Sequence, residues 1–195
     1  MIRRFITTLS LIAWSAVAGH AAILQFHTQL LGANENPPVA SPGSGYALVT
    51  FDTTAHTLVV YASFENLVGT TTVAHIHCCV DEPGTVGVAT YPGTFPGFPA
   101  GVTSGVYNSP LIDLTLAGSF TASFLNNFGG GTPAGAEAAL LQGLLNGQAY
   151  FNIHSTFAPG GEIRGFLTPV PEPGTFVLAG LGLAAAVWRC RKRPA

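Results

Sequence analysis

The chain has 195 residues, of which 48% are hydrophobic and only 8% are charged. Disordered chains have the opposite composition, so we expect a folded domain with a sizeable core. The 24 glycines and 14 prolines argue against a helical bundle and favour a mostly β domain with many turns. Between residues 22 and 170 there are eight acidic residues and one basic residue, which excludes binding of nucleic acid through its phosphates.

The first 21 residues have the pattern of a secretory signal peptide. Arg3 and Arg4 form a short positive region, an apolar run extends from residue 5 to residue 19, and small residues follow. We therefore expect signal peptidase to release a mature chain that begins between residues 19 and 23.

Alternating apolar residues and β-branched or aromatic residues predict the strands of the body. In chain order these strands are 23–31, 45–51, 57–64, 71–77, 111–116, 149–154 and 162–167. Short strands with turns rich in glycine and proline are typical of an antiparallel β-sandwich. The segment 82–110 lacks a strand pattern and carries several aromatic residues, so we expect a long functional loop there.

One short helix is expected at 132–147, where it would cover an open end of the sandwich. Thr132 can cap its N-terminus, Pro133 suits its first position, and Gly147 can end it.

Residues 170–195 form a separate segment with three parts in a fixed order. A Val-Pro-Glu-Pro sequence comes first, an uncharged apolar run at 174–188 comes second, and a basic cluster ends the segment. The apolar run is near the lower length limit of a membrane-spanning helix, and the basic cluster would remain in the cytoplasm. The residues of the first and third parts are Val170, Pro171, Glu172, Pro173, Arg189, Arg191, Lys192 and Arg193.

This order resembles the PEP-CTERM sorting signal of Gram-negative bacteria. The resemblance implies a C-terminal hydrophobic helix that anchors the chain transiently in the inner membrane. An exosortase, a membrane protease, would then cut near Pro-Glu-Pro and deliver the chain to the cell surface or the extracellular matrix. An ordinary single-pass anchor is the alternative.

Four motifs of the body resemble, in this order, those of the CHRD domain, which is named for its occurrence in chordin. They are LGANENPPV at 31–39, AHIH at 74–77, YFNIHS at 150–155 and GEIRG at 161–165. The sequence departs from the family at Ser155, where threonine is usual, and at Cys78-Cys79, where glycine is common. The resemblance gives a domain at 22–169 and implies a sandwich similar to that of Cu/Zn superoxide dismutase.

Three histidines are the candidates for a metal site. His75 and His77 are two residues apart on a predicted strand, so their side chains share one face, and His154 ends another strand. Neutral imidazoles suit copper or zinc, and the arrangement resembles the copper side of the dismutase, without the histidines and aspartate of its zinc site. The alternative is a structural network in which each ring meets a carbonyl or a carboxylate. In both cases we expect the three rings to converge.

Three polar residues are expected around these histidines. Glu162 would orient an imidazole or belong to a structural network, and Asn152 shares the predicted face of His154. Arg164 is the only cation of the body, and its guanidinium would tie the last strand to the segment at 37–38 or to the aromatic loop. Its alternative role is to guide an anion to a metal.

Cys78 and Cys79 would reach an oxidising compartment. They would pair with each other, pair with another chain, or join the histidines on a metal. The Cys-x-x-Cys spacing of a catalytic redox motif is absent from the sequence.

Two classes of function remain, and the first does not require an enzyme. It is an exported protein of the cell envelope or matrix, linked to exopolysaccharide and biofilm as the PEP-CTERM resemblance implies. The aromatic loop at 91–107 would be its binding surface. The second is a copper- or zinc-binding redox protein on a dismutase-like sandwich.

Overall fold

Nine antiparallel strands form one strongly curled sheet in the part of the chain that the structure describes, residues 23–171. The structure is a computed structural model. Along the sheet the strands follow the order β4-β7-β8-β1-β2-β3-β5, with β6 paired to β3 and β9 paired to β1. The expected signal peptide and the tail from residue 172 onward, with its hydrophobic helix, lie outside the described residues.

The strands and helices have the following bounds. The strands are β1 (Ile23–Leu31), β2 (Ser44–Asp52), β3 (Thr57–Glu65), β4 (Thr71–Cys78), β5 (Gly105–Asn108), β6 (Ile112–Asp113), β7 (Ala149–Ser155), β8 (Ile163–Phe166) and β9 (Thr168–Pro169). The helices are α1 (Ala122–Asn127) and α2 (Pro133–Leu145), with 3-10 turns at Gly32–Asn34 and Ala117–Ser119. None of the described helices is long and apolar enough to cross a membrane.

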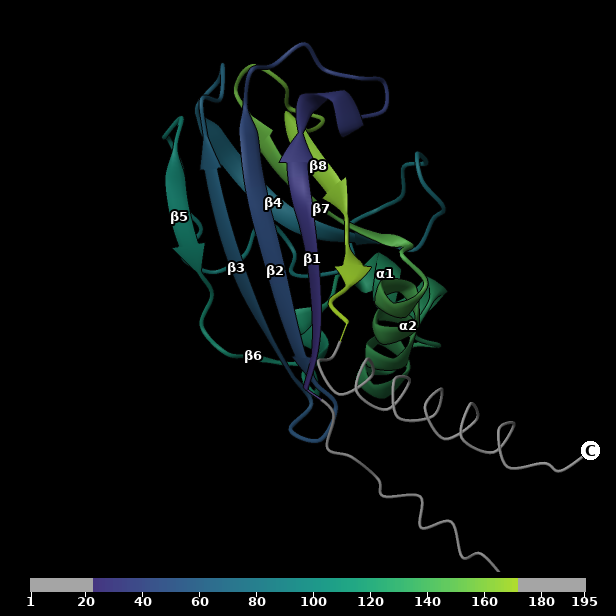
Figure 1. Cartoon of the computed structure of the whole chain (residues 1–195). Helices are drawn as coiled ribbons and strands as arrows, with labels where there is room; N and C mark the ends of the chain where they lie inside the picture. The colour runs from purple at the N-terminus through teal and green to yellow at the C-terminus, as the bar shows by residue number, and fades with distance from the viewer. Residues whose placement is uncertain (1–22, 172–195) are drawn as a thin grey trace, which may run out of the picture.

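The curl of the sheet creates the two layers of the predicted sandwich. Strands β1, β2 and β3 lie in front of β4 and β7 (Figure 1), and apolar side chains from both layers meet between them. Phe26 and Val60 of the front layer and Ile76 and Phe151 of the rear layer are fully buried there. The predicted mainly β, antiparallel fold is therefore confirmed.

Helix α2 begins and ends close to the predicted positions. The side chain of Thr132 accepts a hydrogen bond from the backbone of Gly135, and Pro133 is the first helical residue. The buried face of the helix consists of Ala136, Leu140, Gly143 and Leu144.

Three features of the middle of the chain differ from the sequence predictions. The strand predicted at 111–116 is limited to two paired residues, because Asp113 accepts hydrogen bonds from Thr115 and turns the chain. The short helix α1 was not predicted, although Thr121 caps it by accepting from the backbone of Phe124. Strand β5 lies inside the segment that was expected to be loop.

Most of the aromatic rings of the loop are buried rather than displayed on the surface. Phe95 is fully buried, and Phe98 and Tyr107 are 7% and 3% exposed. Their rings contact one another and the core residue Phe151. The prediction of an aromatic binding surface at 91–107 is therefore wrong, because these rings complete the hydrophobic core.

The rear layer is buried on both faces, and this burial positions the candidate site. All seven residues of β7 are buried, including the three that point away from the core, Tyr150, Asn152 and His154. The loop after β4 pairs with the edge of this strand through backbone hydrogen bonds from Ala89 and Phe95, and its Gly93 and Val86 carbonyls reach His75 and His77 on the outer face. Polar side chains on the outer face of β4, β7 and β8 are thus enclosed between the sheet and the loops.

Candidate metal centre

The structure brings His75, His77 and His154 together on the outer face of the rear layer. His75 and His77 come from β4 and His154 comes from the neighbouring strand β7. One ring nitrogen of each residue lies within 4.8 Å of the corresponding nitrogen of the other two. The three residues are 7%, 8% and 9% exposed, so the cluster lies just beneath the surface.

Each imidazole is oriented by a backbone carbonyl from a covering loop. His75 Nε2 lies 2.7 Å from the carbonyl oxygen of Gly93, His77 Nδ1 lies 2.8 Å from that of Val86, and His154 Nδ1 lies 2.9 Å from that of Pro159. A carbonyl oxygen only accepts hydrogen bonds, so these three ring nitrogens carry the protons. Neutral tautomers are thereby fixed, and the remaining nitrogen of each ring holds a lone pair.

Two of the nitrogens with lone pairs lie close together, and the third is buried. His75 Nδ1 and His154 Nε2 are 3.4 Å apart, and neither carries a proton in these tautomers. His77 Nε2 is buried and has no hydrogen-bond partner. Metal–nitrogen distances of about 2.0–2.1 Å place two ligand nitrogens roughly 3.3–3.6 Å apart, which matches the observed separation.

Burial keeps all three histidines neutral. The pKa of His77 is lowered to about 4, chiefly by burial; the Val86 carbonyl opposes this shift, and the neighbouring His154, His75 and Arg164 add to it. Burial also lowers the pKa of His75 and that of His154. Because metal ions bind the neutral imidazole, the cluster is in its binding form at neutral pH.

Cys78 and Cys79 are joined to each other by a disulfide bond. Their sulfurs lie next to helix α2, where a Cβ atom added to Gly143 would be 2.2 Å from Cys78 Sγ and 2.6 Å from Cys79 Sγ. Among the described residues, the metal-ligand cluster contains histidines only. The sequence left three alternatives for these cysteines, and the structure contains the first, in which they pair with each other.

Glu162 is fully buried and belongs to a hydrogen-bond network away from the imidazoles. It accepts from Ser41 Oγ at 2.6 Å, from the backbone N–H of Val68 at 2.6 Å and of Gly69 at 3.2 Å, and from Ser155 Oγ. The orienting role considered for Glu162 is filled instead by the loop carbonyls, which have no signature in the sequence.

Asn152 lies directly opposite His75 of β4 and Arg164 of β8. Its amide packs against the turn after β7, where a Cβ atom added to Gly161 would be 2.5 Å from Asn152 Nδ2 and 2.7 Å from Glu35 Oε1. Gly161 also has a φ of 133°, so this close approach requires glycine.

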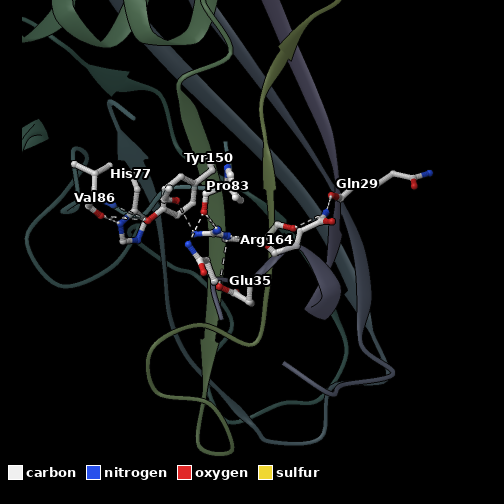
Figure 2. A network of polar contacts seen from close by, with 10 residues as sticks. Gln29, Glu35, His77, Pro83, Val86, Tyr150 and Arg164 are labelled. Atoms are coloured by element: carbon white, nitrogen blue, oxygen red, sulfur yellow. Dashed lines mark hydrogen bonds and ion pairs between the residues drawn. The ribbon is translucent and has the colours of Figure 1, made fainter. Parts of the chain in front are cut away.

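Arg164 connects three distant parts of the chain. Its guanidinium donates to the carbonyl oxygens of Asn34 at 2.6 Å, Pro83 at 2.8 Å and Gly84 at 3.2 Å. Glu35 lies 3.7 Å away (Figure 2), and both side chains are buried. Arg164 therefore ties β8 to the segment before Pro37 and to the first part of the long loop at 82–110, which also carries Val86.

Tyr150 belongs to the same network, although the residue pattern alone did not single it out as a site residue. Its ring stacks on His77 with centroids 4.6 Å apart and planes 6° apart. The guanidinium carbon of Arg164 lies 4.7 Å from the centre of the same ring. The sequence signals were its place at the start of the YFNIHS motif and the alternation along β7, which places Tyr150, Asn152 and His154 on one face.

Val170 donates a backbone hydrogen bond to the carbonyl of Gln25, and Pro171 is the last described residue of the sorting motif. Glu172, Pro173 and the basic cluster lie outside the described residues.

The chain was compared with known families, curated proteins and solved structures. No curated protein and no solved structure matches it. The PEP-CTERM protein-sorting motif matches residues 169–192, which makes the chain an exported protein that an exosortase processes at the membrane on its way to the cell surface. The CHRD domain matches residues 26–167, more than half of the chain, and this protein therefore belongs to the CHRD domain family.

Proposed function

We propose that this exported protein binds one copper or zinc ion through His75, His77 and His154 and acts at the cell surface or in the extracellular matrix as a metal-binding protein. The observation that carries the proposal is the convergence of three lone pairs. Each ring donates its N–H hydrogen bond to a loop carbonyl, and the other nitrogen of His77, Nε2, is buried without a hydrogen-bond partner.

The competing interpretation is a purely structural network. Carbonyl contacts at 2.7–2.9 Å fit that network, but they are equally typical of histidine ligands, whose second nitrogen is held by an outer partner. The inward nitrogens separate the two interpretations. A structural network would leave His75 Nδ1 and His154 Nε2 as two acceptors 3.4 Å apart, whereas a cation would satisfy both.

The chemistry depends on the ion that binds. A copper ion would supply one-electron redox chemistry, and a zinc ion would act as a Lewis acid. The residues of this chain supply three neutral ligands, exclude most of the solvent and fix each tautomer.

The metal content of the purified chain tests the proposal. After incubation with copper or zinc and removal of the free ion, elemental analysis should give about one ion per chain for the parent. His77→Gln should lose most of this metal, and the control His27→Gln, on the front layer, should keep it. A parent chain that retains neither ion would contradict the proposal.

A second proposal concerns the matrix. We propose that the exported chain associates with exopolysaccharide through an open groove of about 820 Å³ on the front layer. The groove is lined by groups that suit sugar hydroxyls and sugar rings, and none of its lining residues is Lys or Arg; they include Gln29, Ser44, Tyr46, Ser63, Glu65 and Asn66. This composition favours a neutral polysaccharide over an anionic one.

Co-sedimentation with exopolysaccharide from the host measures this association. Tyr46→Ala, which removes the aromatic face of the groove, should reduce the bound fraction. The control Val59→Ala changes an exposed residue of β3 outside the groove and should not reduce it. Equal sedimentation of all three chains would contradict the proposal that the groove binds the polysaccharide.

A further inference from the structure

Tyr150 stands between the imidazole of His77 and the guanidinium of Arg164 (Figure 2). We propose that Tyr150 is a positioning residue of the metal centre, which holds the His77 ring and its loop carbonyl in the geometry that a metal ion requires. This inference rests on the proposed metal-binding function and extends it to a residue that is not a ligand.

The first contact is the stack on His77. The two strands place the residues directly opposite each other, with His77 on β4 and Tyr150 on β7. The ring planes are 6° from parallel and the centroids are 4.6 Å apart. A ring held flat against a larger ring cannot rotate about its Cβ–Cγ bond without losing that contact, so the direction of His77 Nε2 is fixed.

The second contact is made by the phenolic hydroxyl. It donates to the carbonyl oxygen of Val86 at 3.2 Å and lies 3.3 Å from the backbone nitrogen of the same residue, from which it accepts. The same carbonyl oxygen accepts the Nδ1 proton of His77 at 2.8 Å. Tyr150 therefore fixes the acceptor that sets the tautomer of His77, and that tautomer leaves Nε2 free for a metal.

The third contact lies on the side of β8. Arg164 packs its guanidinium carbon 4.7 Å from the centre of the Tyr150 ring. It also donates to the carbonyl oxygens of Pro83 and Gly84, which precede Val86 in the same loop. The loop is thus held at Pro83 and Gly84 by Arg164 and at Val86 by Tyr150, with the two side chains packed on each other.

The phenolic hydroxyl is the part of Tyr150 that can be tested separately. Tyr150→Phe keeps the ring and its stack but removes both contacts to Val86. Val86 is only half-buried, so water can replace the lost hydrogen bonds and the fold should be retained. The Val86 carbonyl is then no longer fixed, and the His77 ring can change its tautomer or its tilt.

The experiment measures metal binding by the purified full chain with two probes. Competition with a chromophoric chelator gives the dissociation constant for zinc, and the visible spectrum of the cobalt(II)-loaded chain reports the ligand geometry. Tyr150→Phe should raise the zinc dissociation constant about 10-fold, within the usual 10- to 100-fold effect of outer partners, and should shift the cobalt bands. The matched control is Tyr46→Phe on β2, which removes a phenolic hydroxyl from the front layer and should change neither quantity.

The outcomes distinguish this inference from the proposed function. If the parent chain binds neither ion, the metal-binding function and the role of Tyr150 both fail. If the parent binds zinc and Tyr150→Phe binds it with the same constant and the same cobalt spectrum, the role of Tyr150 alone is overturned.

A measurement on the parent chain covers the case in which Tyr150→Phe does not fold. The Nδ1 proton of His77 should then exchange with solvent as slowly as the backbone amides of the core, since it is held in a buried hydrogen bond. Exchange as fast as that of a free imidazole would overturn the inference.

Discussion

Glu35 and Arg164 lie 3.7 Å apart, from Oε2 to Nε, and their side chains are 6% and 1% exposed. Despite this neighbour, the pKa of Glu35 is raised to about 7, because the effect of burial exceeds the opposing effects of Arg164 and Asn152. The donors of Arg164 are directed at three carbonyl oxygens, so its charge stabilises the carboxylate only from a distance. A proton on Glu35 therefore stabilises the folded chain.

The first prediction follows from the sign of this shift. In the folded chain Glu35 holds its proton up to about pH 7, whereas the unfolded chain releases it near 4.5. The contribution of Glu35 to the free energy of unfolding is thus fully present below pH 4.5 and is lost as the pH rises to about 7, by roughly 2–3 kcal/mol. Denaturation at several pH values should show this loss in the parent relative to Glu35→Gln.

The exposed Glu65 provides the matched control for this experiment. Glu65→Gln should change the stability by less than about 0.5 kcal/mol, because Glu65 lies at the exposed end of β3. A difference in stability between the parent and Glu35→Gln that does not change with pH would contradict the conclusion that the buried Glu35 carboxyl holds its proton up to about pH 7.

The second prediction concerns His77 in the metal-free chain. Its folded pKa of about 4 lies below the value of 6.5 for an exposed imidazole, so the unfolded chain binds more protons between these values. The contribution of His77 to the free energy of unfolding is present above pH 6.5 and is lost as the pH falls to about 4, by at most about 3 kcal/mol. The pH dependence of the parent should exceed that of His77→Gln in this window, measured by denaturation in the presence of a chelator.

The stability contribution of His77 is lost as the pH falls, whereas that of Glu35 is lost as the pH rises. The two single variants therefore separate the effects of the two groups. His27→Gln on β1 is the control for a histidine replaced elsewhere in the fold. Equal pH dependence of the parent and His77→Gln would mean that the imidazole is solvated, against the structure.

The third prediction concerns Glu162, which links three separate segments. Its carboxylate accepts hydrogen bonds from Ser41, Val68, Gly69 and Ser155. Glu162→Gln replaces one acceptor oxygen by an NH₂ donor that faces other donors. The free energy of unfolding should fall by about 2–3 kcal/mol in chemical denaturation. The exposed Glu82 is the control, and Glu82→Gln should change the stability by less than about 0.5 kcal/mol.

Much of the architecture could be predicted because its causes are local. Alternation of apolar and polar residues predicts strands β1 to β4, β7 and β8, and α2 begins where Thr132 and Pro133 predict. The convergence of the three histidines could be predicted for the same reason, since spacing along a strand fixes the face of each side chain. Where a local signal was overlooked, as with the turn at Asp113 and the cap at Thr121, the prediction failed.

The surroundings of the histidines could not be predicted, because their partners are backbone atoms of distant loops. Gly93, Val86 and Pro159 contribute carbonyl oxygens, which every residue has. Alternation along β7 predicts one buried face, but the loops bury the other face as well. The aromatic residues of the long loop were predicted to lie on the surface, because nothing in the local sequence indicates that their rings pack into the core.

The last prediction concerns the contact between α2 and the disulfide. Gly143 lies in the interior of α2, where alanine would normally favour the helix by about 1 kcal/mol. A Cβ atom at this position would be 2.2 Å from Cys78 Sγ and 2.6 Å from Cys79 Sγ, so the helix or the sulfurs would have to move. Gly143→Ala should therefore lower the free energy of unfolding by about 1–3 kcal/mol despite the better helix propensity.

Gly118 provides the control, because a Cβ atom added there meets no atom within 4 Å. Gly118→Ala should leave the stability within about 0.5 kcal/mol of the parent. Reduction of the disulfide in Gly143→Ala should not restore its stability, since two thiols occupy at least the volume of the joined sulfurs. Equal stability of Gly143→Ala and the parent would show that α2 does not pack closely on the Cys78–Cys79 pair.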